Sequence, residues 1–231
     1  DVIADEIYKK VYEKLDFIGI REPRAKALMD ELNITSKLTF DCSSIYLNKL
    51  DQKLLLNVTP YNNYIVFSAS VVANNNTTEV FREIITQLTQ EGKKIVLFNG
   101  GPYEEKIFLE NLYKYFENNK KVTFIETKSI EHFLSVLKHA TMLVSGRFHY
   151  SIVSLFLQRP FILLNSNTSK NLGLLEMLHL PNKVFGFDSK DLKNELLEEV
   201  RKIREEPEKY ILQSVELENL EKLARDNIVF E

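Results

Sequence analysis

Arg147, His149 and Lys170 are the side chains whose types and spacing best suit chemistry on an anionic molecule. Arginine and lysine bind phosphate and carboxylate groups, and histidine exchanges a proton near neutral pH. Arg147 and His149 follow residues 141–144, a β-branched and apolar run that is typical of a buried strand. Lys170 follows the next apolar run along the chain. We therefore expect these three side chains to face one anion-binding crevice.

The segments around these residues predict a unit of strand, loop, helix and strand. Ile152, Leu155 and Phe156 have the i, i+3, i+4 spacing of a helix face, and the helix must end before Pro160. Residues 161–164 form a second continuous apolar run, as expected of a parallel strand that is covered on both faces. The loops that follow the two strands then lie at the carboxyl edge of the sheet, where α/β proteins bind their ligands.

A longer stretch that includes these residues resembles a known family. It comprises Arg147-Phe148-His149, a helix of small and apolar residues, the run RPFILLN, and Lys170 shortly before the run LGLLEMLHL. Together these features resemble the carboxyl-terminal signature of the polysaccharide pyruvyl transferase family.

A second match to this family lies far upstream. Residues 16–22, with the sequence DFIGIRE, are similar to the family's strand that ends in Arg-Asp or Arg-Glu and leads into a helix. Asp41 would then correspond to the family's aspartate a little further on. The chain departs from the pattern at Ala25, where the family commonly has a serine.

The resemblance implies a transferase that moves pyruvate from phosphoenolpyruvate onto a sugar of a cell-surface polysaccharide or its precursor, which forms a pyruvate ketal. It implies that Arg21, Arg147 and Lys170 bind the phosphate and carboxylate of the donor. Ketal formation also needs a proton delivered to the enol carbon, and His149 is our candidate general acid. His149, Arg21 and Lys170 are thus the predicted catalytic residues. The scheme requires no metal and no cofactor besides the donor substrate.

A further set of residues is predicted to bind the substrates: Arg147, Ser145, Asn99, Gly100 and Asp41. Asn99-Gly100-Gly101 follows a predicted strand and would let the backbone approach a phosphate or sugar, although a simple turn is the alternative. Asp41 would orient either an acceptor hydroxyl or Arg21, or it is an ordinary turn residue. His132, His139 and His179 lack metal-ligand spacing and are interpreted as structural or solvated.

Two other functions remain open at this stage. The first is a GT-B glycosyltransferase that uses a nucleotide sugar. In that case Arg147 and Lys170 would neutralise the leaving diphosphate, and Glu176 would hold the ribose. The second is a non-catalytic binding module, in which Arg21 would form a surface ion pair and His149 would bond to the backbone at the start of a helix.

The composition is that of an ordinary globular protein. The chain has 231 residues, of which 44% are hydrophobic and 27% charged, and its formal net charge is -3. Nothing in this balance favours nucleic acid as a partner, and no apolar run is long enough to span a bilayer. Cys42 is the single cysteine, which fits a reducing compartment. We expect a small-molecule donor, a saccharide acceptor that is free or lipid-linked, and a place of action in the cytoplasm or at the inner membrane surface.

Strands alternate with helices along most of the chain, which predicts an α/β fold with a doubly wound parallel sheet. Strands are predicted at residues 17–20, 37–40, 64–70, 94–98, 121–125, 141–144, 161–164 and 184–187. Helices are predicted at residues 2–14, 23–32, 79–90, 104–117, 129–139, 190–206 and 207–227. Thr77 or Thr78 is the predicted cap of the helix at 79–90, and Ser129 caps the helix that it begins.

This layout resembles the GT-B architecture, in which two Rossmann-like domains enclose a cleft. Residues 1–58 would be the end of an amino-terminal Rossmann-like domain, and residues 59–231 a carboxyl-terminal one with terminal helices. Residues 42–63 have no clear period and are the predicted linker. The final helix is expected to cross back to the first domain. Arg21 would then face His149 and Lys170 across the interdomain cleft.

Overall fold

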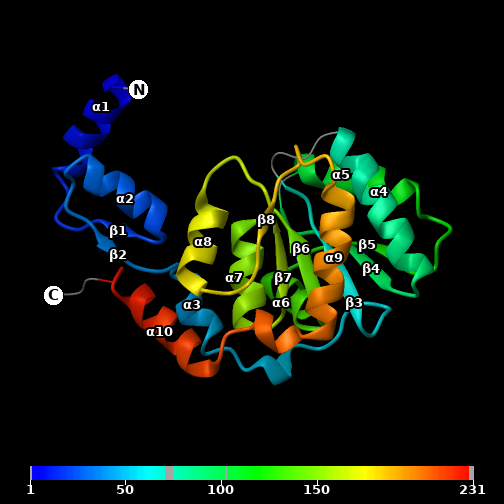
Figure 1. Ribbon diagram of the computed structural model, residues 1–231. Coiled ribbons are helices and arrows are strands. Elements are labelled where there is room, and N and C mark those ends of the chain that lie inside the picture. Colours follow the sequence, from blue (N-terminus) through cyan, green and yellow to red (C-terminus); the bar gives the residue numbers. More distant parts are fainter. Residues whose placement is uncertain (1, 71–74, 102, 229–231) are drawn as a thin grey trace.

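The computed structural model describes residues 2–70, 75–101 and 103–228. These residues form a large part around a six-stranded sheet and a small part around a two-stranded sheet. Figure 1 shows the small part, with α1, α2, β1 and β2, on one side of the large part. Every strand pairing in both sheets is parallel. The predicted α/β class is thereby confirmed.

The large sheet has the order β5-β4-β3-β6-β7-β8. Its strands are β3 (Tyr64–Phe67), β4 (Lys94–Asn99), β5 (Val122–Glu126), β6 (Ala140–Ser145), β7 (Phe161–Leu164) and β8 (Val184–Phe185). The chain therefore starts in the middle of the sheet, builds outward to one edge, and returns to build outward to the other edge. This is the doubly wound Rossmann order, and its switch point lies between β3 and β6.

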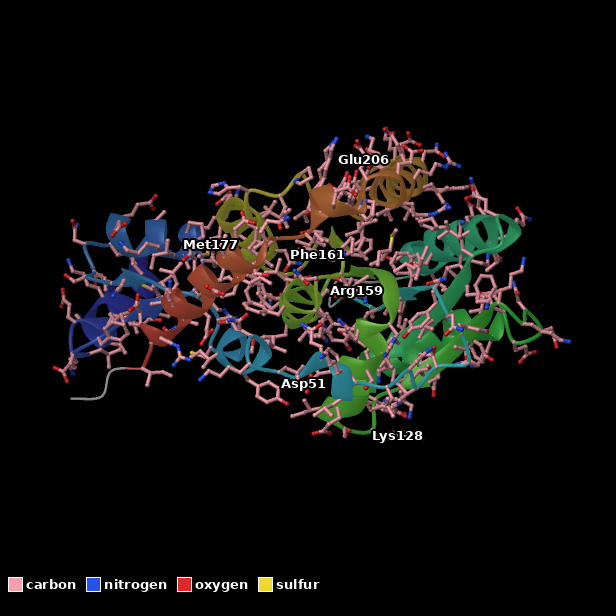
Figure 2. All side chains as sticks on the ribbon, turned by 90° about the horizontal axis from the view of Figure 1, so that it is seen from below. Asp51, Lys128, Arg159, Phe161, Met177 and Glu206 are labelled. Carbon is pink, nitrogen blue, oxygen red and sulfur yellow. The ribbon has the colours of Figure 1, made fainter. Side chains whose placement is uncertain are left out.

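Alternation along the strands divides the core into two layers. Tyr64 and Val66 of β3 pack on one face of the sheet, whereas Ile65 and Phe67 pack on the other. The first face is covered by α3 (Ser43–Leu47), α6 (Ile130–Lys138), α7 (Phe148–Phe156), α8 (Lys170–Leu178) and α10 (Ser214–Arg225). The second face is covered by α4 (Asn75–Gln90), α5 (Tyr103–Lys114), α9 (Leu192–Glu205) and the 3-10 helix η2 (Pro207–Tyr210). Phe161, at the start of β7, is fully buried in the middle of this arrangement (Figure 2).

The small part consists of α1 (Val2–Tyr12), β1 (Gly19–Ile20), α2 (Pro23–Glu31) and β2 (Lys37–Leu38). Its own core contains Ile18, Met29 and Ile34. The buried carboxylate of Glu22 begins α2, because its oxygens accept hydrogen bonds from the backbone N–H groups of Arg24 and Ala25 at 2.8 and 2.9 Å. This cap places Arg21 at the carboxyl end of β1, immediately before the helix.

The first contact between the two parts is the packing of α2 against α8. Gly173 of α8 lies against the Glu22 side chain, and a Cβ at position 173 would be 1.9 Å from Oε2 of Glu22. Met177 of the same helix lies where the small part meets the large part in the view from below (Figure 2). A glycine is therefore needed on α8 for the two helices to approach this closely.

The second contact is made by the carboxyl-terminal segment. Helix α10 runs back toward β2 (Figure 1), and Asp226, just after it, forms an ion pair with Lys37 at 3.2 Å. Asn227 accepts a hydrogen bond from the Thr39 hydroxyl at 2.9 Å and donates one to the Phe40 carbonyl at 2.8 Å. The prediction that the final helix crosses back to the first part is confirmed.

Several boundaries differ from the predictions. Helix α4 begins at Asn75, so neither Thr77 nor Thr78 is its cap. The strand predicted at 17–20 is only Gly19–Ile20, and Phe17 is 38% exposed. The terminal helix predicted at 207–227 is interrupted between η2 and α10, where Gln213 forms a capping box that starts a new helix.

The segment predicted as a linker is packed against the large part. It contains α3 and the 3-10 helix η1 (Gln52–Leu54), and Leu47 and Leu55 are buried in the same core layer as β3. Its two helices have only five and three residues, which is too short to show a period, and this explains the prediction. Among the described residues, no helix is both long enough and apolar enough to cross a membrane.

We expect Gly173→Ala to destabilise the protein by about 1 to 3 kcal/mol, because the added methyl group overlaps the Glu22 carboxylate. Urea unfolding measures the change. Glu22→Ala alone is expected to cost about 1 kcal/mol through loss of the α2 cap. If the overlap is the cause, Gly173→Ala costs much less in the Glu22→Ala background. Equal costs in the two backgrounds would contradict this explanation.

Candidate functional site

Residues from the two distant sequence matches meet in one cluster. The Arg21 guanidinium donates a hydrogen bond to the Asp41 carboxylate at 2.7 Å. His149 Nε2 lies 3.4 Å from the same Asp41 oxygen and 3.4 Å from Arg21 Nη1. The fold thus brings side chains that are far apart in the sequence, one from the small part and one from the large part, to a shared carboxylate.

Phe148, which separates Arg147 from His149 in the sequence, contacts Arg21. The Arg21 guanidinium lies over the Phe148 ring at 4.6 Å from its centroid, which is a cation–π contact. Phe148 is the first residue of α7 and is buried. The Phe148 ring and the Asp41 carboxylate therefore fix the position of the Arg21 guanidinium together.

Asp41 is the centre of this cluster and is only 7% exposed. Its Oδ1 accepts hydrogen bonds from the Ser43 hydroxyl at 2.6 Å and the Ser43 backbone N–H at 3.1 Å. Burial raises the pKa of Asp41, but the hydrogen bonds from His149 and Ser43 together lower it by more. The net pKa is therefore well below its ordinary value. Asp41 is thus a fixed anion that orients Arg21 and His149.

His149 is the most accessible member of the cluster, with 65% of its side chain exposed. It lies in the first turn of α7, and its Nε2 faces Asp41. A histidine in this position can exchange a proton with a bound molecule while a buried carboxylate fixes the orientation of its ring.

Arg147 belongs to a second arginine–carboxylate pair. It forms an ion pair with Glu105, which is buried in the first turn of α5. The backbone N–H of Arg147 donates to the Ser145 hydroxyl at 3.0 Å, which shapes the turn between β6 and α7. Gly146 in this turn lies against Ser70, where a Cβ would be 2.3 Å from the Ser70 side chain.

Lys170 completes the group of cations. Burial lowers the pKa of Lys170, and the charges of Arg21 and Arg147 lower it further. The next residue of α8, Asn171, is buried and donates hydrogen bonds to the carbonyls of Gly146 and Leu164 at 3.1 Å each. Asn171 thus fixes the amino end of α8 beside the loop that carries Arg147.

A cleft of about 640 Å³ opens between the two parts at this position. Its walls include Arg21 and Asp41 from the small side and Ser169 and Lys170 from the start of α8. Ser169 precedes α8 without a side-chain cap hydrogen bond, so the amino end of this helix lies at the cleft together with the two cations. Such a surface suits a small, multiply charged anion.

Three of the predicted substrate-binding residues have protein partners. Ser145 is fully buried beneath the Arg147 turn. The Asn99 side chain accepts from the Gly101 N–H at 3.3 Å, and the Gly100 N–H donates to the Tyr150 hydroxyl at 2.6 Å. These contacts favour the alternative reading of residues 99–101 as a turn. The role of these three residues in substrate binding stays a prediction.

The remaining histidines lie outside the cluster. His139 contacts the Leu55 carbonyl at 2.8 Å, and burial lowers the pKa of His132, with a further contribution from Lys128. His179 ends α8 in a left-handed backbone conformation. In the part of the chain that the structure describes, no group of three or more histidine, cysteine, aspartate or glutamate residues could hold a metal ion.

Sequence reasoning missed Glu105, which it placed in a helix without a role. The clue was the Asn-Gly-Gly-Pro break before α5, because Gly101 leaves room for the carboxylate: a Cβ there would be 2.5 Å from Glu105 Oε2. It also missed Phe148 as the support of Arg21. A contact between residues so far apart in the chain leaves no mark on the sequence around either one.

Comparisons with known proteins identify the family. The sequence model described as polysaccharide pyruvyl transferase matches residues 3–168. The chain belongs to this family. Arg21, Asp41, Arg147 and His149 lie within the matched range, and Lys170 lies just beyond it. A search among curated proteins found no match for this chain.

Solved structures of similar fold support the GT-B-like architecture. The UDP-GlcNAc 2-epimerase of Methanocaldococcus jannaschii, solved with UDP-GlcNAc and UDP, is 16% identical with a TM-score of 0.64, over 92% of this chain and 60% of its own. HepE of Anabaena, solved with UDP and glucose, is 11% identical with a TM-score of 0.55, over 96% and 62%. A glycosyltransferase from Rickettsia africae is 13% identical with a TM-score of 0.55, over 96% and 61%.

The chain spans about 60% of the length of these structures. At this level of identity the likeness concerns the fold alone. Together with the parallel six-stranded sheet, it confirms the predicted GT-B-like, Rossmann-type class of the polypeptide.

We expect Asp41→Asn to lower the free energy of unfolding at pH 7 by about 1 to 3 kcal/mol, because a buried, hydrogen-bonded charge is lost beside Arg21. The folded-state pKa of Asp41 is below its unfolded value of about 3.9, so this contribution is present above pH 4 and disappears as the pH falls further.

Urea unfolding of both proteins between pH 7 and pH 3 tests this expectation. The difference between wild type and Asp41→Asn should narrow below about pH 4. Asp30→Asn, in an exposed pair with Lys26, is the matched control and should change stability by less than about 1 kcal/mol. A difference that stays constant over the whole pH range would contradict the assignment.

Proposed function

We propose that this protein transfers pyruvate from phosphoenolpyruvate to a sugar of a cell-surface polysaccharide or its lipid-linked precursor and forms a pyruvate ketal. The observation that carries the proposal is the meeting of the two family motifs. Arg21 of the upstream motif stacks on Phe148 and lies 3.4 Å from His149 of the downstream motif. Membership in the polysaccharide pyruvyl transferase family supports the same reaction.

The charges of the cleft suit this donor. Phosphoenolpyruvate carries a phosphate and a carboxylate, and the cleft offers Arg21 and Lys170 with Arg147 close by. Asp41 and Glu105 form ion pairs with the two arginines, and the carboxylate of Glu22, which caps α2, also lines the cleft. Planar guanidinium groups bind either anionic group of the donor through paired hydrogen bonds. We assign these three cations to donor binding.

His149 is assigned to the proton transfer. In the proposed reaction it protonates the methylene carbon of the donor, which leaves the adjacent carbon electron-poor. A sugar hydroxyl attacks that carbon and returns its proton to His149. A second hydroxyl of the same sugar then displaces the phosphate, its proton leaves with the phosphate, and the ketal ring closes. The Asp41 carboxylate, 3.4 Å from Nε2, would stabilise the protonated ring before the transfer.

We also propose that residues 1–58 are the end of an amino-terminal Rossmann-like domain and that residues 59–231 form the carboxyl-terminal one. Exposed apolar side chains on and after α1, namely Ile7, Tyr8, Val11 and Leu15, support this division. A two-stranded sheet is also too small to be stable alone.

The nucleotide-sugar alternative gains no specific support from the site. Glu176, which would hold a ribose in that reading, forms an ion pair with Arg24 at 2.7 Å on the outer side of α2 and α8. The two functions are separated by the ligand that the protein binds.

Calorimetric titration with phosphoenolpyruvate tests donor binding. We expect wild-type protein to bind it, and we expect Arg21→Ala and Lys170→Ala each to weaken binding tenfold or more through loss of a charged hydrogen bond. Arg24→Ala, which removes a nearby arginine outside the cleft, is the control and should bind as wild type does. Binding of a nucleotide sugar in place of phosphoenolpyruvate would move the assignment to glycosyl transfer.

His149→Gln separates proton transfer from binding. We expect this variant to bind phosphoenolpyruvate within about threefold of wild type and to lose a factor of about 10² to 10⁴ in the rate of ketal formation. Release of phosphate in the presence of a saccharide acceptor measures the rate. A variant that keeps the wild-type rate would exclude His149 as the general acid.

A further inference from the structure

Glu105 is a buried carboxylate with a single charged partner. It is 5% exposed, and its Oε1 forms an ion pair with Nη2 of Arg147. Among the described residues, neither oxygen accepts a hydrogen bond from any other group, and Arg147 Nε is likewise buried without a partner. A buried carboxylate is unfavourable unless it is well paired, so the burial of Glu105 with few partners needs an explanation.

The local sequence is built to accommodate this carboxylate. Gly101 lies against it, since a Cβ there would be 2.5 Å from Oε2 and 3.6 Å from Arg147 Nη2. Tyr150 lies beside the pair: burial raises its pKa to about 12, and the Glu105 charge adds to that rise. The Tyr150 hydroxyl accepts the Gly100 N–H at 2.6 Å and so holds the loop around the pair in place.

A role in stability alone does not account for the pair. Replacing a buried ion pair with apolar residues of similar size is often neutral or stabilising, so such a pair is weak evidence for a contribution to the fold. The position of the pair favours a role in function. Glu105 lies behind the loop that leaves β6 at the switch point of the sheet, and Arg147 is close enough to Lys170 to lower its pKa.

We propose that Glu105 is a positioning residue that fixes the Arg147 guanidinium toward the cleft and offsets part of its charge. The carboxylate pairs with Nη2 of the guanidinium, and 24% of the Arg147 side chain stays exposed and would be available to an anionic ligand. Glu105 thus does for Arg147 what Asp41 does for Arg21, from the opposite part of the molecule. The inference rests on the proposed function only for its turnover measurement.

Glu105→Gln tests the proposal because it keeps the size of the side chain and removes the charge. We expect the variant to bind inorganic phosphate at least threefold more tightly, since the Arg147 charge is no longer offset. We also expect its rate of ketal formation to fall at least tenfold, since the guanidinium is no longer fixed. Glu104→Gln, on the same turn of α5 but exposed, is the matched control and should change neither value.

The Arg147→Ala background shows whether Glu105 acts through Arg147. Arg147→Ala alone should lower the midpoint of thermal unfolding, because the Glu105 charge is left buried without a partner. Adding Glu105→Gln should recover most of that loss and should no longer change phosphate affinity. An equal effect of Glu105→Gln on phosphate affinity with and without Arg147 would overturn the proposal.

Two further outcomes would also overturn it. One is a Glu105→Gln protein whose phosphate affinity and turnover both stay within twofold of wild type. The other is weaker phosphate binding in that variant, which would mean that the carboxylate supports the shape of the loop only. If wild-type protein binds phosphate but not phosphoenolpyruvate, the proposed function fails, and phosphate affinity still decides the role of Glu105.

Discussion

Repulsion among like charges is the constraint on which the arrangement of the cleft depends. Arg21, Arg147 and Lys170 approach one another closely enough that both arginines lower the pKa of the lysine. Such a cluster is unfavourable in the absence of an anion, and the structure offsets it with two buried carboxylates. Asp41 neutralises Arg21 and Glu105 neutralises Arg147, while Lys170 lacks an ion pair of this kind among the described residues. Lys170 is therefore the one cation of this group whose charge no ion pair among the described residues offsets.

The tripeptide Arg147-Phe148-His149 makes three different connections. Arg147 reaches back to α5 through Glu105, Phe148 carries the guanidinium of Arg21, and His149 faces the carboxylate of Asp41. Two of these connections lead to the small part and one leads into the large part. The motif thus carries residues of the candidate site and also connects the two parts, which gives each of its three positions a separate physical requirement.

The features that sequence could predict are those with local causes. The continuous apolar runs of β3 and β4, the Ser129 cap and the helix end before Pro160 each depend on neighbours within a few positions, and the structure has all of them. Contacts between segments that are distant in the chain could not be predicted from the sequence. Nothing near Gly173 indicates that it faces Glu22, and nothing near Asn227 indicates that it hydrogen-bonds to Phe40. Arg21, Asp41 and His149 were brought together by the family resemblance, whereas Glu105 had no motif to mark it.

The central strand has a consequence for the way this chain folds. Tyr64 to Phe67 must pair with β4 on one side and, on the other, with β6, which begins only at Ala140. During synthesis the second side of β3 stays unpaired until the whole segment through β6 has left the ribosome. Parallel pairing between strands this far apart in the sequence raises the contact order and slows folding. The apolar β3 edge is exposed during that interval, so the nascent chain is vulnerable to aggregation, and chaperones are expected to determine its yield.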